Sequence, residues 1–227
     1  MQETTLDPSF DVETVDTYEL GLKSRLSDTT TFNITFFDSV FENFQLLQFT
    51  GTSFKVVTAD EVTTTGFETE LLVNPMDGLN ISLNYQNAEA EYTKPFTLID
   101  PQRGPLVLTG RTINLAPEHS ASLSASYTRP IRNTDYKATI YGAYSYESEY
   151  STYAGLIAGR EQDDYTMLMA RLGVHTLDDK YGLELWCRNC TDEAVAQIIF
   201  QSPIADDSTF AFMHPPLEWG ITLSARY

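Results

Sequence analysis

Apolar and polar residues alternate with a period of two along most of this 227-residue chain. That period places successive side chains on opposite faces of a β-strand, so each alternating run predicts a strand with one apolar and one polar face. About nine such runs are present, and helical spacing is nearly absent. The runs cover residues 18–23, 32–36, 66–73, 79–86, 121–127, 136–146, 168–174, 183–188 and 219–227. The pattern predicts an all-β fold of antiparallel strands.

The connections between these runs alternate between short and long. The short ones are 27–30, 74–78, 128–135 and 177–180, which contain the Asn, Asp, Pro and Gly residues of tight turns. The long ones are roughly 48–60, 93–112, 147–163 and 192–216. Short periplasmic turns at one end and long extracellular loops at the other are typical of outer-membrane barrels. We therefore predict a segment of an antiparallel transmembrane β-barrel.

The residues on the two faces support this prediction. Polar positions hold Ser, Asn, Gln, Gly and Glu, as in a hydrated barrel lumen, and apolar positions hold Leu, Ile, Val and Ala. Aromatic residues lie on the apolar face near several strand ends: Tyr85, Tyr127, Trp219 and Tyr227. Such rings form girdles at the membrane interfaces, although they would equally pack a soluble core. The runs 79–92, 165–176 and 216–227 reach the about 9–11 residues that a tilted strand needs to cross a bilayer.

Charge and segment composition narrow the classes of function. The formal net charge is −18, so nucleic acid is an unfavourable partner because its phosphates would be repelled. No apolar stretch is long enough for a transmembrane helix, and the first residues lack the basic and apolar regions of a signal peptide. The chain is therefore either cytoplasmic or part of a longer protein.

Candidate chemistry is sparse. No Ser–His–Asp arrangement, phosphate-binding glycine loop or metal-ligand spacing is present, so we predict no enzyme activity, no cofactor and no metal site. Glu68 and Glu70 share one strand face, which we interpret as part of a hydrated lumen wall. Cys187 and Cys190 form a Cys-x-x-Cys pair that ends a strand instead of beginning a helix, which disfavours a redox role. We expect two unpaired thiols, with a local disulfide as the alternative.

Five stretches of the chain, taken in order, carry a family resemblance: VDTYELGLKS (15–24), TTTGFETELLVNPMDGLNISLNYQNAEAEY (63–92), INLAPEHSASLSASY (113–127), LWCRNCTDE (185–193) and PPLEWGITLSARY (215–227). Together they resemble the C-terminal half of the barrel of TonB-dependent outer-membrane receptors. Two features depart from the family pattern. Neither Leu217 nor Glu218 is the Arg that the family often has there, and Cys190 replaces a usual Leu. Both departures affect the mouth of the strands and leave the fold unchanged.

The resemblance implies an active-transport receptor in the outer membrane of a Gram-negative bacterium, most commonly one for a ferric siderophore. It implies that residues 1–227 are the C-terminal portion of a barrel of about 22 strands, with the plug domain and the first strands absent. The implied partners are the plug domain of the full-length chain, which Glu68 and Glu70 would contact, the TonB complex, the barrel-assembly machinery and outer-membrane lipid. A passive outer-membrane porin and a soluble β-sandwich binding module are the alternatives.

Two sets of residues are candidates for binding. Aromatic residues in the predicted outer loops are suited to stacking on a ligand: Tyr150, Tyr153, Phe210 and Phe212. In the last strand, four residues have a spacing that resembles the outer-membrane assembly signal: Gly220, Leu223, Ala225 and Tyr227. We expect that strand to pair with the first strand of a complete barrel, so that no strand edge faces lipid.

Overall fold

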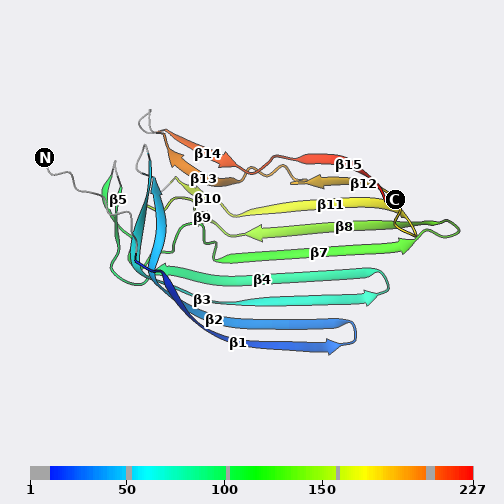
Figure 1. The fold of residues 1–227 in the computed structure, drawn as a ribbon, viewed down its shortest axis with the longest axis horizontal. Coiled ribbons are helices and arrows are strands. Elements are labelled where there is room, and N and C mark those ends of the chain that lie inside the picture. Colours follow the sequence, from blue (N-terminus) through cyan, green and yellow to red (C-terminus); the bar gives the residue numbers. More distant parts are fainter. Residues whose placement is uncertain (1–10, 50–52, 101–102, 157–158, 203–207, 227) are drawn as a thin grey trace.

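The computed structural model describes residues 11–49, 53–100, 103–156, 159–202 and 208–226. Among these residues, nine strands form one antiparallel sheet in which each strand pairs with the next sheet strand along the chain (Figure 1). They are β1 (Thr14–Ser27), β2 (Thr30–Phe49), β3 (Phe54–Met76), β4 (Leu79–Tyr92), β7 (His119–Pro130), β8 (Tyr136–Glu147), β11 (Tyr165–Thr176), β12 (Tyr181–Arg188) and β15 (Glu218–Ala225). The predicted all-β antiparallel fold of about nine strands is confirmed.

In the described part of the chain, four short turns join sheet strands at one end of the sheet, on the right in Figure 1. They connect β1 to β2, β3 to β4, β7 to β8, and β11 to β12. Gly78 shows why the β3–β4 turn needs glycine. Its φ is +82°, and an added Cβ would collide with the carbonyl oxygen of Thr128, whose N–H donates to the Gly78 carbonyl at 2.9 Å. The predicted short turns are confirmed.

The opposite end of the sheet holds the long connections, and these are more ordered than loops. Three two-stranded hairpins occur there among the described residues. Their strands are β5 (Thr97–Asp100) with β6 (Gly104–Val107), β9 (Tyr150–Ser151) with β10 (Glu161–Gln162), and β13 (Ala196–Gln201) with β14 (Thr209–Met213). Within the described ranges, no helix has the length and apolar character needed to cross a membrane.

The prediction of a long loop over 48–60 is wrong. Strands β2 and β3 have 20 and 23 residues and stay paired until Phe49 lies opposite Phe54. About 9–11 residues of a strand cross a bilayer, so roughly half of each strand extends beyond that span. The pair turns away from the other strands at the long-loop end (Figure 1), and Asn43 within β2 has a φ of 56°. Beyond Asn43 burial still alternates in β2, since Leu46 and Gln48 are buried and Leu47 is 64% exposed, but polarity does not follow burial, so strict alternation of polar and apolar residues is lost.

The sheet is a single layer with two chemically different faces. One face, called here the apolar face, is strongly exposed: Tyr18, Leu20 and Leu223 are 77%, 76% and 79% accessible. Register keeps its residues together across strands, as where Leu172 lies opposite both Ile140 and Leu185. The alternate residues form the polar face. Because no second layer covers either face, the strands themselves enclose little core.

The buried core lies at the long-loop end. It consists of Leu46, Ala59, Val62, Tyr92, Leu98, Leu108, Ala154 and Leu156. These residues come from the extended β2–β3 hairpin, from the end of β4, from β5 and from the segments around 108 and 155. Burial of one large apolar side chain contributes about 1.5–3 kcal/mol, so this cluster holds the long connections in fixed positions above the sheet.

Candidate functional site

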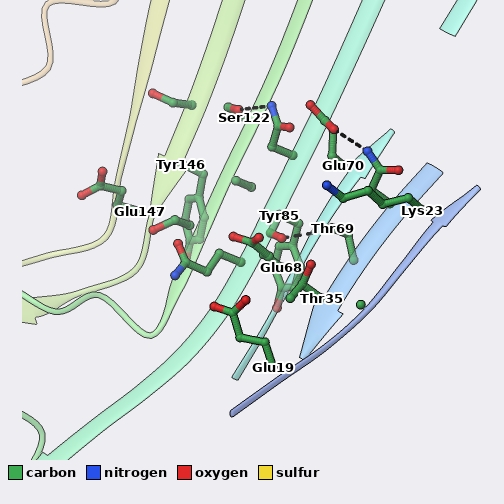
Figure 2. Close-up of a pocket in the computed structure, with 17 residues that line it drawn as sticks. Glu19, Lys23, Thr35, Glu68, Thr69, Glu70, Tyr85, Ser122, Tyr146 and Glu147 are labelled. Carbon is green, nitrogen blue, oxygen red and sulfur yellow. Dashed lines mark hydrogen bonds between the residues drawn. The ribbon is translucent and has the colours of Figure 1, made fainter. Parts of the chain in front are cut away.

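The polar face is hollowed over β1, β2, β3, β4, β7 and β8, where a cavity of about 810 Å³ opens to solvent. Figure 2 shows four carboxylates around it, those of Glu19, Glu68, Glu70 and Glu147, together with the ammonium of Lys23. We call these four glutamates the acidic wall. The remaining lining includes neutral polar side chains such as Asn84 and Ser122, which hydrogen bond to each other at 3.1 Å.

Two of the four carboxylates are satisfied within the chain. Oε2 of Glu70 accepts a hydrogen bond from Nδ2 of Asn33 at 2.7 Å, and Oε2 of Glu147 accepts one from the Tyr165 hydroxyl at 2.8 Å. Across the described residues, no side-chain hydrogen bond or ion pair reaches the carboxylate of Glu19 or Glu68. These two glutamates lie diagonally across β2, one on β1 and one on β3. The arrangement is suited to binding cationic groups that enter the hollow.

Tyr153 lies inside the long connections, with its side chain 6% exposed. Its hydroxyl donates to Oδ2 of Asp100 at 2.9 Å, and the guanidinium of Arg160 lies 4.2 Å from its ring centroid. Burial raises the pKa of the Tyr153 hydroxyl to about 12. Tyr153 therefore joins the 150–162 segment to β5. Tyr150, in β9, is half-buried, and burial also raises its pKa.

A second aromatic group lies on the β13–β14 hairpin. The ring of Phe200 contacts those of Phe210 and Phe212, with centroids 5.4 and 5.9 Å away. Phe54, at the tip of the β2–β3 hairpin, meets Phe200 edge-on at 5.9 Å. Phe54, Phe210 and Phe212 remain 56%, 43% and 59% exposed. We call these four residues the loop-end aromatic cluster. Its exposed rings form a surface on which a planar or apolar ligand can stack.

The base of the β13–β14 connection is fixed by Asn189. Its side-chain amide donates to the carbonyl oxygens of Glu193 and Pro215 at 2.8 and 3.2 Å, so both ends of the connection are held at one point. Asn189 has a φ of 46°, which reverses the chain directly after β12. This reversal brings the Cα atoms of Cys187 and Cys190 to 5.6 Å, and the two form a disulfide. The expectation of two unpaired thiols is wrong, and the alternative is confirmed.

Comparison with known proteins identifies the barrel. A family model described as "TonB dependent receptor-like, beta-barrel" matches residues 2–190. This chain belongs to that family.

Solved structures with this receptor-barrel fold include several siderophore receptors. The ferric yersiniabactin uptake receptor FyuA of Yersinia pestis is 17% identical, with a TM-score of 0.74 over 93% of this chain and 30% of its own. The siderophore receptor PiuA of Acinetobacter baumannii is 18% identical, with a TM-score of 0.66 over 92% of this chain and 28% of its own. The ferric-catecholate import receptor Fiu of E. coli K12 is 17% identical, with a TM-score of 0.64 over 94% of this chain and 27% of its own. The chain thus spans less than a third of the length of these structures.

Membership of the receptor-barrel family indicates what each face of the sheet contacts. The barrel lies in the outer membrane of a Gram-negative bacterium, with the apolar face toward lipid and the polar face toward the lumen. The family is one of transport receptors and not of enzymes. Across the described residues, no group of three or more His, Cys, Asp and Glu side chains could hold a metal ion. In this chain the sheet is not closed, since β1 and β15 are its two edges.

The structure places three of the predicted assembly-signal residues of this receptor barrel on β15. Leu223 and Ala225 lie on the apolar face, and Gly220 lies on the polar face beneath Trp186. An added Cβ at Gly220 would lie 2.5 Å from Cζ2 of Trp186, so a small residue is required there. Tyr227 lies outside the described residues. Recognition by the assembly machinery stays a prediction.

The predicted loop aromatics of this receptor barrel fall into two groups. Phe210 and Phe212 lie together in the loop-end aromatic cluster, with ring centroids 6.3 Å apart. Tyr150 and Tyr153 lie in the neighbouring 150–162 segment, where Tyr153 has a structural role. Sequence reasoning missed Phe54, because its segment was assigned to a loop. It also missed Glu19, although the alternation of Tyr18, Glu19 and Leu20 already places this carboxylate on the polar face.

Proposed function

We propose that residues 1–227 are the C-terminal portion of a TonB-dependent receptor barrel that imports a ferric siderophore across the outer membrane. The observation that carries the proposal is the sheet, which has one lipid-facing and one hydrated face. It matches the barrels of siderophore receptors over more than nine-tenths of the chain. Edge strands β1 and β15 support a place within a larger closed barrel, because an unpaired strand edge in hydrocarbon is costly.

The acidic wall is the proposed docking surface for the plug domain. Glu19 and Glu68 have no partner among the described residues, and both line a hydrated hollow on the lumen side. A cationic side chain from a plug would satisfy both carboxylates and gain charge-assisted hydrogen bonds. The force from the TonB complex would act on that plug, so the strength of these contacts would set how readily the plug moves.

The loop-end aromatic cluster is the proposed surface for first contact with the siderophore, with Tyr150 nearby and Tyr153 holding the segment in place. The exposed rings of Phe54, Phe210 and Phe212 support this proposal. We further propose that β15 is recognised by the barrel-assembly machinery through Gly220, Leu223, Ala225 and Tyr227. In the finished barrel, the apolar face would contact outer-membrane lipid.

Iron uptake by the full-length receptor tests the proposal. Cells that express the wild-type receptor as their sole siderophore receptor are expected to accumulate radiolabelled iron from a panel of ferric siderophores. Uptake should be lost when TonB is deleted. Uptake that persists without TonB would indicate a passive porin and contradict the proposal.

A double variant tests the docking surface. Glu19→Gln with Glu68→Gln removes both unpaired charges, so the plug is expected to be held less tightly and the receptor to admit bulky antibiotics that the wild-type receptor excludes. Glu149→Gln, on the exposed connection after β8, is the matched control and should behave as wild type. Equal antibiotic entry in the double variant and the control would contradict plug docking at the acidic wall.

A further inference from the structure

The charged groups on the polar face differ between its two halves. The half formed by β1 to β4, called here the acidic half, has three of the four glutamates of the acidic wall, Glu19, Glu68 and Glu70, with Lys23 as the cation in its hollow. The half formed by β8, β11, β12 and β15 is called here the basic half for the two arginines on its lumen-facing positions, Arg171 and Arg188. Its lumen-facing positions also hold Glu147, Glu184 and Glu218.

A second hollow of about 450 Å³ lies on this basic half. Its lining includes Tyr141, Met167, Met169, Arg188, His214 and Glu218. The 214–216 segment, which follows the β13–β14 hairpin, forms one side of the hollow. The lining thus combines an aromatic ring and two thioethers with charged groups. Such a mixture is suited to an organic ligand that has both flat apolar and charged parts.

Both arginines are stacked on aromatic rings. The guanidinium of Arg171 lies 5.5 Å from the ring centroid of Tyr141, and that of Arg188 lies 5.2 Å from the ring centroid of Trp186. Nη2 of Arg171 also contacts Sδ of Met169 at 3.7 Å, which places Arg171 at the border of the hollow. Stacking fixes the plane of a guanidinium while its N–H groups stay available for a bidentate anion.

Neither arginine forms an ion pair with a carboxylate among the described residues. Glu218 lies opposite Arg188 in the β12–β15 register, yet no ion pair forms between them. Glu184, the other carboxylate on the polar face of β12, lies 3.4 Å from Nε2 of His175. The guanidinium groups of the two arginines therefore remain available to an anion, with Glu184 and Glu218 as neighbouring carboxylates on the same face.

Their positions define a direction along the lumen. Arg171 lies opposite Trp186, and Arg188 is two residues further along β12 toward the long-loop end. A rise of about 3.4 Å per residue separates the two levels by roughly 7 Å. An anionic ligand that leaves Arg188 would meet Arg171 next on its way toward the short-turn end.

We propose that Arg171 and Arg188 form an anion-binding path for the transported ligand, and that this path follows the β8–β15 half of the lumen while the plug docks on the acidic half. The ligand class is an anionic chelate with planar donor groups, such as a catecholate or carboxylate ferric complex. The proposal rests on the proposed function for the identity of its cargo. The preference of the basic half for anions can be measured without that cargo.

Uptake of two iron chelates by cells with the full-length receptor tests the path. One probe is a trianionic ferric triscatecholate and the other is a neutral ferric trihydroxamate. The double variant Arg171→Gln with Arg188→Gln is expected to lower uptake of the anionic probe about threefold to tenfold relative to the neutral probe. Lys23→Gln, which removes a lumen cation from the acidic half, is the matched control and should leave the ratio unchanged.

A labelling experiment separates failure of the path from failure of the proposed function. Single cysteines replace Ala143 in the basic half and Thr35 in the acidic half of the full-length receptor. An anionic and a cationic methanethiosulfonate of similar size are then compared. The ratio of anionic to cationic reaction rate should be at least threefold higher at position 143 than at position 35, because local potential raises the concentration of the opposite charge. The arginine double variant should abolish that difference.

The outcomes are distinct. Transport of neither probe, with the labelling difference intact, would overturn siderophore import and leave the anion path standing. Transport of both probes in a ratio that the arginine variant does not change would overturn the path and leave the proposed function standing. Equal labelling ratios at the two positions, or no reaction at position 143, would also overturn the path.

Discussion

The rings of Phe54 and Phe200 meet edge-on, with centroids 5.9 Å apart, although they come from the first and the last long connections of the chain. This contact joins the tip of the β2–β3 hairpin to the β13–β14 hairpin. The contact thus links connections near the two opposite edges of the sheet, β1 and β15, on the lumen side. The loop-end aromatic cluster therefore bridges the two hairpins, in addition to its proposed role in ligand contact.

Removal of the Phe200 ring should separate the two hairpins. An edge-to-face pair contributes about 0.5–1.5 kcal/mol beyond its area burial, so Phe200→Ala is expected to speed amide hydrogen exchange at the tips of both hairpins. Phe212→Ala is the matched control, since Phe212 contacts Phe200 and Phe210 on its own hairpin. It should speed exchange in β13–β14 alone. Unchanged exchange around Phe54 in Phe200→Ala would contradict the bridge.

The hydroxyl of Tyr153 should control the order of the β5–β6 hairpin. Tyr153→Phe removes the 2.9 Å bond to Asp100 and leaves that buried carboxylate with one fewer donor, which costs about 1–3 kcal/mol locally. Hydrogen exchange in residues 97–107 is expected to rise. Tyr181→Phe, at an exposed ring on β12, is the control and should have no such effect.

The same hydroxyl predicts an alkaline transition. Since burial raises the pKa of Tyr153 to about 12, its contribution to stability is complete below the ordinary tyrosine pKa near 10 and is lost as pH rises through about 12. Hairpin exchange in the wild type should approach that of Tyr153→Phe over this range. A difference between the two proteins that stays constant to pH 12 would contradict the assignment.

Asp179 predicts an acid transition at the short-turn end. The Lys137 ammonium donates to its Oδ2 at 2.7 Å and holds the pKa of Asp179 below its ordinary range. A depressed pKa contributes stability above the ordinary Asp pKa, near 4, and that stability is lost as pH falls through the lowered value. Asp179→Asn should therefore lower the thermal unfolding temperature at pH 7 and have little effect at pH 2. Asp135→Asn, in the neighbouring turn, is the control and should match wild type at both pH values.

The disulfide should stabilise the base of the β13–β14 connection and leave the sheet intact. A loop this short contributes about 2 kcal/mol by the chain-entropy account. Replacement of both Cys187 and Cys190 by Ser is expected to speed proteolysis between 191 and 217 while the sheet keeps its resistance. Alkylation of the denatured wild type should require prior reduction. Alkylation without reductant would contradict the disulfide.

The sequence predicts the sheet well because one face meets lipid and the other meets water. Leu20 is on the apolar face and the adjacent Glu19 is on the polar face, so the period of two is visible in the sequence itself. The same contrast is missing past Asn43, where one face of β2 and β3 packs against the long connections instead of meeting water or lipid. Gln48 is buried there on the same face as Leu46, while the apolar Leu47 between them is 64% exposed, so the polar and apolar pattern that identifies a strand disappears.

The candidate site is less visible in the sequence because it depends on contacts between distant segments. The polar face predicts Glu68 and Glu70 as lumen residues, and alternation also places Arg171 and Arg188 there. Alternation cannot reveal that Asn33 satisfies Glu70 or that Tyr141 and Trp186 support the arginines. Likewise, the reversal at Asn189 that closes the disulfide depends on a backbone conformation that the Cys-x-x-Cys spacing does not specify.

The central claim is that the polar face of this sheet lines a hydrated transport path while its apolar face contacts lipid. Spin labels at successive positions of β15 in the full-length protein, reconstituted in bilayers, test this most directly. Labels at Ile221 and Leu223 should collide mainly with oxygen dissolved in lipid, and labels at Thr222 and Ser224 mainly with a water-soluble nickel chelate. Equal access of the nickel chelate to all four positions would contradict the account.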